Sequence, residues 1–291
     1  RRNPDTTLSP NSIAKHLKTL RAILNKAADD GLIQPYEIPR KLISVKEIPP
    51  TITGLQDEEL NKLITLPIKE NTDRWNARNL FLFAMYEGGI RIGDIIQLRW
   101  RNIVGDRLIY VMTKNGKQVN VILVQEAKKI LMRYKRQGQR PEHYIFPYLD
   151  SSAEYAKYLD YEDRQKMPPD ISKKLFETIN AREARIGMML REIRALTGIP
   201  HLTFHTARHT FALRAKEANV DNTTLKNILK HSSLNTTETY VKKLDCRSED
   251  AAMRVMYLDK ARKNKEKKRI IKQIQKLGFS TEELIELLAG D

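Results

Sequence analysis

The sequence predicts a mainly α-helical fold with one small β-hairpin or sheet. Apolar residues recur at helical spacing in three long stretches, at residues 171–197, 205–218 and 222–230. Two β-rich runs, residues 107–112 and 118–123, flank Asn115-Gly116, a dipeptide suited to the positive φ angles of a tight type I′ turn. These patterns favour a helical domain that carries a hairpin with Lys114 and Lys117 at its tip.

The first expected element is a helix over roughly residues 8–35. Ser9 can cap this helix, and Pro10 has the φ angle of a first helical position. Its apolar stripe is formed by Ile13, Leu17, Leu20, Ile23 and Leu24. One helix buries too little apolar surface to stand alone, and the prolines that follow predict a linker. We therefore interpret residues 1–50 as part of a helical domain plus a linker. Because the chain opens with Arg1-Arg2 in place of Met, we expect a segment before residue 1.

A second domain is expected over residues 51–245. Its first helices are predicted near residues 55–66, 73–86 and 126–136. The second of these helices is broken at Gly88-Gly89. The polar stretch 149–170 is interpreted as a loop or an insertion. Residues 235–238 resemble a capping box that opens a short helix carrying Tyr240.

The remaining residues, 246–291, are interpreted as a basic tail. Residues 254–276 hold ten lysines and arginines against two acidic residues. Such runs are commonly solvated charged helices, and contact with DNA is the alternative. Residues 280–283 predict a capping box ahead of an amphipathic helix that could dock on this subunit or on a neighbour. The apolar face of that helix comprises Leu284, Ile285, Leu287 and Leu288.

The charge of the chain favours a polyanionic partner. Lys plus Arg total 52 against 36 Asp plus Glu, a formal net charge of +16. Nucleic acid is the first candidate, although a merely solubilising surface also accounts for charge alone. No apolar run approaches the ~20 residues of a membrane-spanning helix, so no membrane partner is expected. A single cysteine, Cys246, excludes an intrachain disulfide and a cysteine-based zinc cluster, in agreement with a reducing, cytoplasmic setting.

Four segments that carry reactive side chains follow one another along the second domain. They are residues 89–94, 113–117, 205–209 and 231–240. Together they resemble the tyrosine recombinase family, whose order is an Arg, a hairpin Lys, a His-x-x-Arg pair, a His or Trp, and a Tyr nine residues later. His231 and Tyr240 are nine residues apart here. The resemblance implies a tyrosine recombinase catalytic fold over about residues 55–245 and, more loosely, the end of a core-binding domain over residues 8–35.

The chemistry of DNA cleavage explains why these residue types are needed. Attack on a phosphodiester builds charge on its non-bridging oxygens. Arg91 and Arg208 are the candidate phosphate clamp, because a guanidinium binds two phosphate oxygens and stays charged, and no metal is then expected. The phenol of Tyr240, with a reference pKa of about 10, needs a positive field or a base to attack. His205 is the candidate general base.

The family resemblance assigns the remaining residues. Lys114 would protonate the departing 5′-oxygen, His231 would hydrogen-bond the phosphate, and Asp94 would support the site. Lys117 lies on the same turn and is the alternative to Lys114, whereas a helix N-terminal charge is the alternative reading of Asp94. Lys230 replaces a glycine that commonly precedes the histidine in the family. Lys117 and Lys230 are expected to contact DNA.

The resemblance implies a site-specific DNA recombinase that forms a 3′-phosphotyrosyl intermediate without a cofactor. Exchange between two duplexes implies double-stranded DNA as partner and a homo-tetramer joined through the C-terminal helix in trans, with accessory DNA-bending proteins as further candidates. Two other functions fit the same residues. One is a non-catalytic DNA-binding regulator on this fold, and the other is a nicking-and-closing enzyme such as a type IB topoisomerase or a hairpin-forming resolvase.

Overall fold

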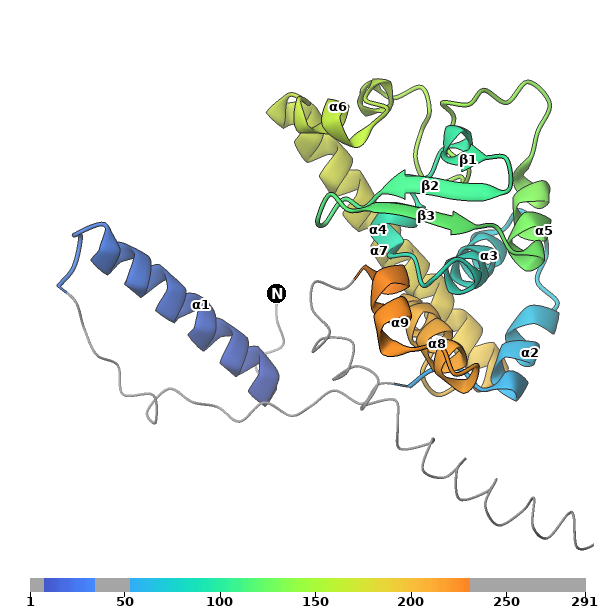
Figure 1. Ribbon diagram of the computed structural model, residues 1–291, viewed down its shortest axis with the longest axis horizontal. Helices are drawn as coiled ribbons and strands as arrows, with labels where there is room; N and C mark the ends of the chain where they lie inside the picture. The colour runs from blue at the N-terminus through green and yellow to red at the C-terminus, as the bar shows by residue number, and fades with distance from the viewer. Residues whose placement is uncertain (1–7, 35–52, 231–291) are drawn as a thin grey trace, which may run out of the picture. The chain divides into compact units, whose positions relative to one another are not determined.

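The computed structural model describes residues 8–34 and 53–230 (Figure 1). The chain divides into two units, residues 1–51 and 52–291. The proline-rich linker, the helix expected to carry Tyr240 and the basic tail lie outside the described residues.

Helix α1, Pro10–Asp29, is the described part of the first unit. Its start is as expected, because the Ser9 hydroxyl accepts a hydrogen bond of 3.2 Å from the backbone N–H of Ser12 and Pro10 opens the helix. Ala14 is its one buried residue, and the apolar side chains of Leu20 and Ile23 are exposed.

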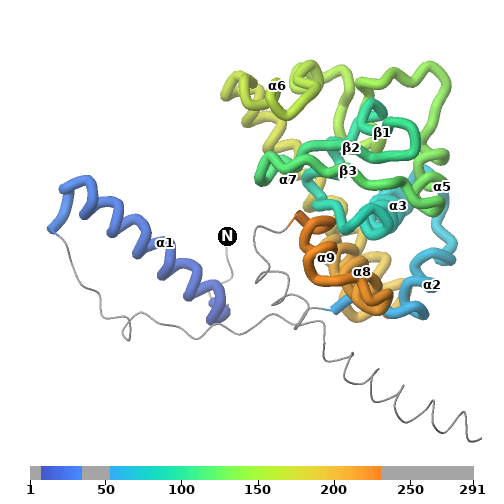
Figure 2. The backbone as a smooth tube through the Cα atoms, in the orientation of Figure 1, coloured from blue at the N-terminus to red at the C-terminus, as the bar shows by residue number. Residues whose placement is uncertain are grey.

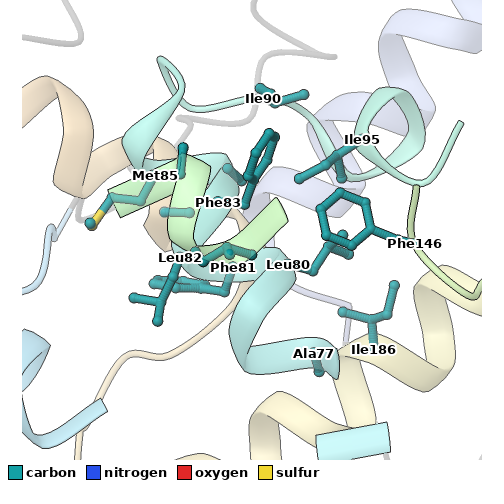
Figure 3. Close-up of a cluster of buried hydrophobic side chains, with 14 of the residues drawn as sticks. Ala77, Leu80, Phe81, Leu82, Phe83, Met85, Ile90, Ile95, Phe146 and Ile186 are labelled. Atoms are coloured by element: carbon teal, nitrogen blue, oxygen red, sulfur yellow. The ribbon is translucent and has the colours of Figure 1, made fainter. Parts of the chain in front are cut away.

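Helix α3, Asp73–Tyr86, forms the centre of the second unit. The Thr72 hydroxyl caps it, and every residue from Trp75 to Met85 is buried. A helix that is buried on all sides needs neighbours on all sides. These neighbours are α5 (Gln125–Tyr134), α7 (Pro169–Thr197) and α8 (Phe204–Glu217). Figure 3 shows apolar side chains of α3 gathered with Ile95, Phe146 and Ile186.

Three short strands form an antiparallel sheet in the order β1-β2-β3. The strands are Ile103–Val104, Arg107–Val111 and Gln118–Ile122, with Ile109 opposite Asn120 across the hairpin. The short helix α4, Ile92–Ile95, and the 3₁₀ turn η2, Trp100–Asn102, lead into the sheet. The mainly helical fold class with a small sheet is therefore confirmed.

The helices that follow begin and end with residues typical of helix termini, and α7 starts two residues before the predicted 171. Helix α7 opens at Pro169 and ends before Gly198, whose φ of 69° is left-handed. Thr203 and Thr206 form a capping box at the start of α8. Helix α9, Asn222–Leu229, is capped by Asp221. Helix α2, Asp57–Thr65, has three acidic residues in its first turn.

The stretch 149–170, expected to be a loop or an insertion, is folded. It contains the 3₁₀ turn η3, Glu154–Lys157, and helix α6, Tyr161–Gln165. Its apolar side chains form a small separate core with the start of α7, made of Tyr144, Leu149, Tyr155, Ala156, Met167, Ile171 and Leu175. In the view of Figures 1 and 2, α6 lies at one end of the unit and the pair α8–α9 at the other.

Candidate active site

Arg208 on α8 joins three segments that are far apart in the sequence. Its guanidinium donates a hydrogen bond of 3.0 Å from Nη1 to the carbonyl oxygen of Gly89 and one of 2.5 Å from Nη2 to the carbonyl oxygen of Leu229. The side chain is 6% exposed. Two carbonyl acceptors on opposite segments fix the plane of the guanidinium. Arg208 thereby links the turn before Arg91, helix α8 and the end of α9.

Gly89 permits the close approach of Arg208. A Cβ atom at this position would lie 2.7 Å from Cγ and 2.8 Å from Cα of Arg208, closer than real side chains pack. The φ angle of Gly89 is 71°, in the left-handed region that glycine adopts at low cost. The Gly88-Gly89 break after α3 therefore creates the space in which Arg208 lies.

Asp94 and Arg91 connect helix α4 with the hairpin. The carboxylate of Asp94, 6% exposed, accepts a hydrogen bond of 2.9 Å from the backbone N–H of Thr113. Arg91 is the N-cap residue of α4, and its Nη1 lies 3.8 Å from the sulfur of Met112. The end of β2 is thus held to the segment that carries Arg91. Together with the contacts of Arg208, these bonds bring the segments of Arg91, Lys114 and His205 toward one region, next to the end of α9.

The loop between β2 and β3 carries Lys114 and Lys117, both exposed. The N–H of Met112 donates to the carbonyl oxygen of Lys117, and the N–H of Gly116 donates to the carbonyl oxygen of Met112, each at 3.0 Å. Of the dipeptide Asn115-Gly116, only the glycine has a positive φ, 64°. The prediction of a type I′ turn was therefore wrong, since that turn needs positive φ at both central residues. The loop is longer, and its other residues keep negative φ angles.

His205 lies in the first turn of α8 and is exposed. Partial desolvation of its imidazole lowers the pKa, and the positive charges of Arg208 and Arg91 lower it further. The ring is therefore neutral near pH 7 and able to accept a proton. It meets the ring of His209 edge-on, with the centroids 4.5 Å apart and an interplanar angle of 90°.

Two residues near the site had no role in the sequence predictions. Burial lowers the pKa of His209 to about 4, helped by the nearby charges of His205 and Arg208. Tyr110, in β2, is buried, and burial raises the pKa of its phenol together with the charge of Asp94, while Arg208 and Arg91 oppose the increase. His209 follows Arg208 directly, which is a signal that sequence reasoning could have used. An aromatic residue in a β-strand gives no such signal.

Lys230, the last described residue, ends α9 in the left-handed conformation, with φ 53° and ψ 37°. Its N–H donates to the carbonyl oxygen of Lys226. The backbone turn that a glycine would make before His231 is thus present with a lysine in its place. His231 and Tyr240 themselves lie outside the described residues.

Within residues 8–34 and 53–230, no group of three or more His, Cys, Asp or Glu side chains is placed to hold a metal ion. Over the same ranges, no helix has both the length and the apolar composition needed to cross a bilayer.

Comparison with known proteins gives a family match over most of the second unit. Residues 54–247 match the model of the phage integrase family. The chain is 25% identical over 211 residues to the tyrosine recombinase XerA of Thermococcus kodakarensis, covering 72% of this chain and 62% of that protein. It is 26% identical over 243 residues to the tyrosine recombinase XerD of Xanthomonas axonopodis pv. citri, covering 80% and 72%. The chain thus spans less than two thirds of the XerA relative.

Solved structures share the fold at low sequence identity. A lambda integrase fragment, residues 75–356, crystallised as a dimer bound to a COC′ core site, matches with a TM-score of 0.52 and 16% identity, covering 82% of each chain. The site-specific recombinase XerH, bound to its difH substrate before cleavage, matches with a TM-score of 0.53 and 17% identity, covering 80% of this chain and 62% of that one. The comparison supports the catalytic-domain fold.

Proposed function

Because the chain belongs to the phage integrase family of tyrosine recombinases, we propose that it is a site-specific DNA recombinase acting through a 3′-phosphotyrosyl intermediate. The observation that carries the proposal is the position of Arg208, which bonds to Gly89 and Leu229 and so holds the turn before Arg91 and the end of α9 around itself. A recombinase needs these groups around one phosphate. The names of the relatives and the DNA-bound structures with the same fold support duplex DNA as the partner.

In the proposed reaction the phenol oxygen of Tyr240 forms a bond to the scissile phosphorus, and the bond from phosphorus to the 5′-oxygen breaks. The neutral imidazole of His205 takes the phenol proton, and Lys114 gives a proton to the departing 5′-oxygen. Arg91 and Arg208, with a hydrogen bond from His231, stabilise the charge on the non-bridging oxygens. A 5′-hydroxyl from another strand reverses the sequence, so the energy of the phosphodiester is retained.

Asp94 acts in this proposal through its hydrogen bond to Thr113, the neighbour of Lys114. That contact favours the supporting role over a simple helix N-terminal charge. Lys117 and Lys230 would contact the DNA backbone as cations. Residues 51–245 form the catalytic domain of the proposal, residues 1–50 the end of a core-binding domain with its linker, and residues 246–291 a tail whose apolar helix docks in trans in a tetramer.

The test begins with a library of random-sequence duplexes, from which repeated rounds of binding select a preferred site. The selected duplex is then nicked near its centre, so that the cleaved strand end diffuses away and religation stops. Incubation with the full chain and denaturing electrophoresis should give a covalent protein–DNA adduct. The adduct should disappear in Tyr240→Phe, while binding of the intact duplex persists.

The same assay separates the proposal from the two other functions. A regulator without catalysis would bind the selected duplex and give no adduct with any nick position. A nicking-and-closing enzyme would relax supercoiled plasmid that lacks the selected site as fast as plasmid that carries it. A recombinase should instead exchange strands between two copies of the selected site.

A further inference from the structure

The folded segment that contains α6 is fixed to the second unit by a buried arginine. Arg99, 4% exposed, donates hydrogen bonds from Nη2 to the hydroxyl of Tyr144 at 2.9 Å and to the carbonyl oxygen of Ala156 at 3.0 Å. Its guanidinium also lies 4.2 Å from the centre of the Tyr144 ring. Such a buried, multiply bonded arginine makes the segment part of the body of the protein rather than a free loop.

Helix α6 has two further attachments near the candidate site. Asp160, its N-cap, pairs with Arg101 at 3.5 Å. Arg164, on the helix, donates from Nη1 to Oε1 of Gln97 at 2.8 Å. The Gln97 amide is itself held, because its Nε2 donates to the carbonyl oxygen of Gly93 at 2.6 Å. Arg164 thus connects α6, through Gln97, to the segment that contains α4 with Arg91 and Asp94.

The same helix contacts the β2–β3 loop directly at the tip and is linked to its base through Gln97. At the tip, a Cβ atom on Gly116 would lie 3.4 Å from the hydroxyl oxygen of Tyr161 and 3.5 Å from its Cζ, so the phenol ring covers the glycine. At the base, Nε2 of Gln97, the partner of Arg164, lies 3.5 Å from Oγ1 of Thr113. Lys114 lies between these two supported positions.

A polar cavity of about 240 Å³ separates α6 from the sheet behind the loop. Its walls include Asp94, Tyr110, Thr113, Tyr161 and Arg164. The loop is therefore not packed on the core, and residues 113–117 are exposed. An exposed lysine has many rotamers, and these must be restricted before its amine can reach one oxygen atom.

We propose that α6 positions Lys114 for proton transfer, with Tyr161 supporting the loop at Gly116 and Arg164 supporting it through Gln97 at Thr113. The inference rests on the proposed function, in which Lys114 protonates the leaving 5′-oxygen. Tyr161 and Arg164 are positioning residues, because both act through the loop and neither needs to touch DNA.

The test uses two versions of the selected, nicked duplex, one with the natural 5′-bridging oxygen at the cleavage position and one with sulfur there. A thiolate leaves without being protonated, so the sulfur substrate does not need the general acid. Single-turnover cleavage of the oxygen substrate should fall about 10- to 100-fold in Tyr161→Ala and in Arg164→Met. On the sulfur substrate both variants should cleave within about 3-fold of the original chain. Gln165→Ala, an exposed residue of the same helix, is the control and should match the original chain on both.

Two results would overturn the inference. Equal losses on the oxygen and sulfur substrates would show that α6 serves stability or another step, and undiminished cleavage of the oxygen substrate would show that the loop needs no support. Lys114→Ala separates this inference from the proposed function. If that variant is rescued by sulfur and Tyr161→Ala is not, only the role of α6 is wrong. If Lys114→Ala is not rescued, the role assigned to Lys114 is wrong, and the inference fails with it.

Amide hydrogen exchange gives a readout that does not depend on cleavage. In Tyr161→Ala the amides of residues 113–117 should exchange faster than in the original chain, while those of α3 keep their protection. Gln165→Ala should leave the loop unchanged. The same loop exchange in Tyr161→Ala as in Gln165→Ala would contradict the proposed contact at Gly116.

Discussion

The carbonyl oxygen of Gly89 accepts a hydrogen bond of 3.0 Å from Nη1 of Arg208, across 119 residues of sequence. The two residues also pack closely, and a side chain on Gly89 would collide with the Cα, Cβ and Cγ atoms of Arg208. The position of the guanidinium therefore depends on the absence of a single methyl group.

Gly89→Ala should destabilise the second unit and impair the site together. The left-handed φ of 71° costs an alanine about 1 kcal/mol, and the contact at 2.7 Å forces Arg208 or its helix to move, for a total of about 2–4 kcal/mol. Urea unfolding measures the loss, and the emission of Trp75 and Trp100, both in this unit, reports it. Covalent adduct formation should fall at least about 100-fold, because a displaced guanidinium no longer stabilises the phosphate.

Gly105→Ala is the matched control for that substitution. Gly105 also has a left-handed φ, 60°, but a Cβ there would meet no atom within 4 Å. This variant should lose only the backbone contribution of about 1 kcal/mol and keep its cleavage activity. Equal losses in the two variants would mean that the contact with Arg208 has no energetic weight.

Glu87, the C-cap of α3, lies two residues before Gly89 and is 3% exposed. Its Oε1 accepts a hydrogen bond of 3.1 Å from the N–H of Val124, while within the described part of the chain its buried Oε2 has no hydrogen-bond partner. Burial raises the pKa of this carboxyl to about 7, although the Val124 bond and the charge of Lys128 oppose the increase. The folded protein therefore holds a proton here that the unfolded chain releases near pH 4.5.

Glu87→Gln should remove a dependence of stability on pH. A pKa that is raised in the fold contributes stability that is complete below about pH 4.5 and is lost as the pH rises through about 7. The amide cannot ionise, so the variant should be more stable than the original chain at pH 8, by about 1–3 kcal/mol, and equal to it at pH 4. Urea unfolding at a series of pH values measures the difference. A constant difference across that range would show that Glu87 does not titrate between pH 4 and 8.

The helices were predictable because their signals are local. Ser9-Pro10, from which the start of α1 was predicted, acts on backbone groups within one turn, and so do Gly198 after α7 and Asp221 before α9. Pro169, which opens α7, had been assigned to the preceding loop or insertion. The order of the reactive segments was likewise readable, since it needs only residue types and spacing. That information identifies candidates without placing them in space.

The contacts that assemble the site could not be predicted, because they are long-range. No local pattern pairs Arg208 with Gly89 or Asp94 with the amide of Thr113. The prediction of a type I′ turn was wrong for a related reason. Asn115-Gly116 favours a two-residue turn by itself. In the fold, residues 112–117 connect the two strands, and the loop packs at Gly116 against Tyr161, a residue of the stretch interpreted as a loop or an insertion.

Lys117→Gln should weaken DNA binding mainly through counterion release. Lys117 is an exposed cation that closes the β2–β3 loop. A contact to one phosphate adds about 0.9 to the slope of log affinity against log salt concentration, so the variant should lose about that much. Binding of the selected duplex over a range of salt concentrations measures the slope. Lys135→Gln is the control and should keep the original slope, because Lys135 is an exposed lysine that directly follows α5 and is not part of the loop.

Cleavage at saturating protein decides between the two lysines of the loop. Lys114→Gln should lose about 100-fold or more in single-turnover cleavage, as expected for a missing general acid. If Lys117→Gln shows that loss and Lys114→Gln does not, the roles of the two lysines are exchanged.

Lys230→Gly should stabilise the second unit, because Lys230 ends α9 with a φ of 53° that a side chain with a Cβ adopts at a cost. Glycine at a left-handed helix C-terminus relieves that cost, and we expect a gain of about 0.5–1 kcal/mol in urea unfolding. Lys230→Ala is the matched control, since it also removes the ammonium but keeps the Cβ, and it should leave the stability unchanged. A gain of the same size in both variants would assign the effect to charge instead of to the backbone. Both variants should bind the selected duplex with an equally reduced salt dependence, because each loses the same cation beside the proposed phosphate site.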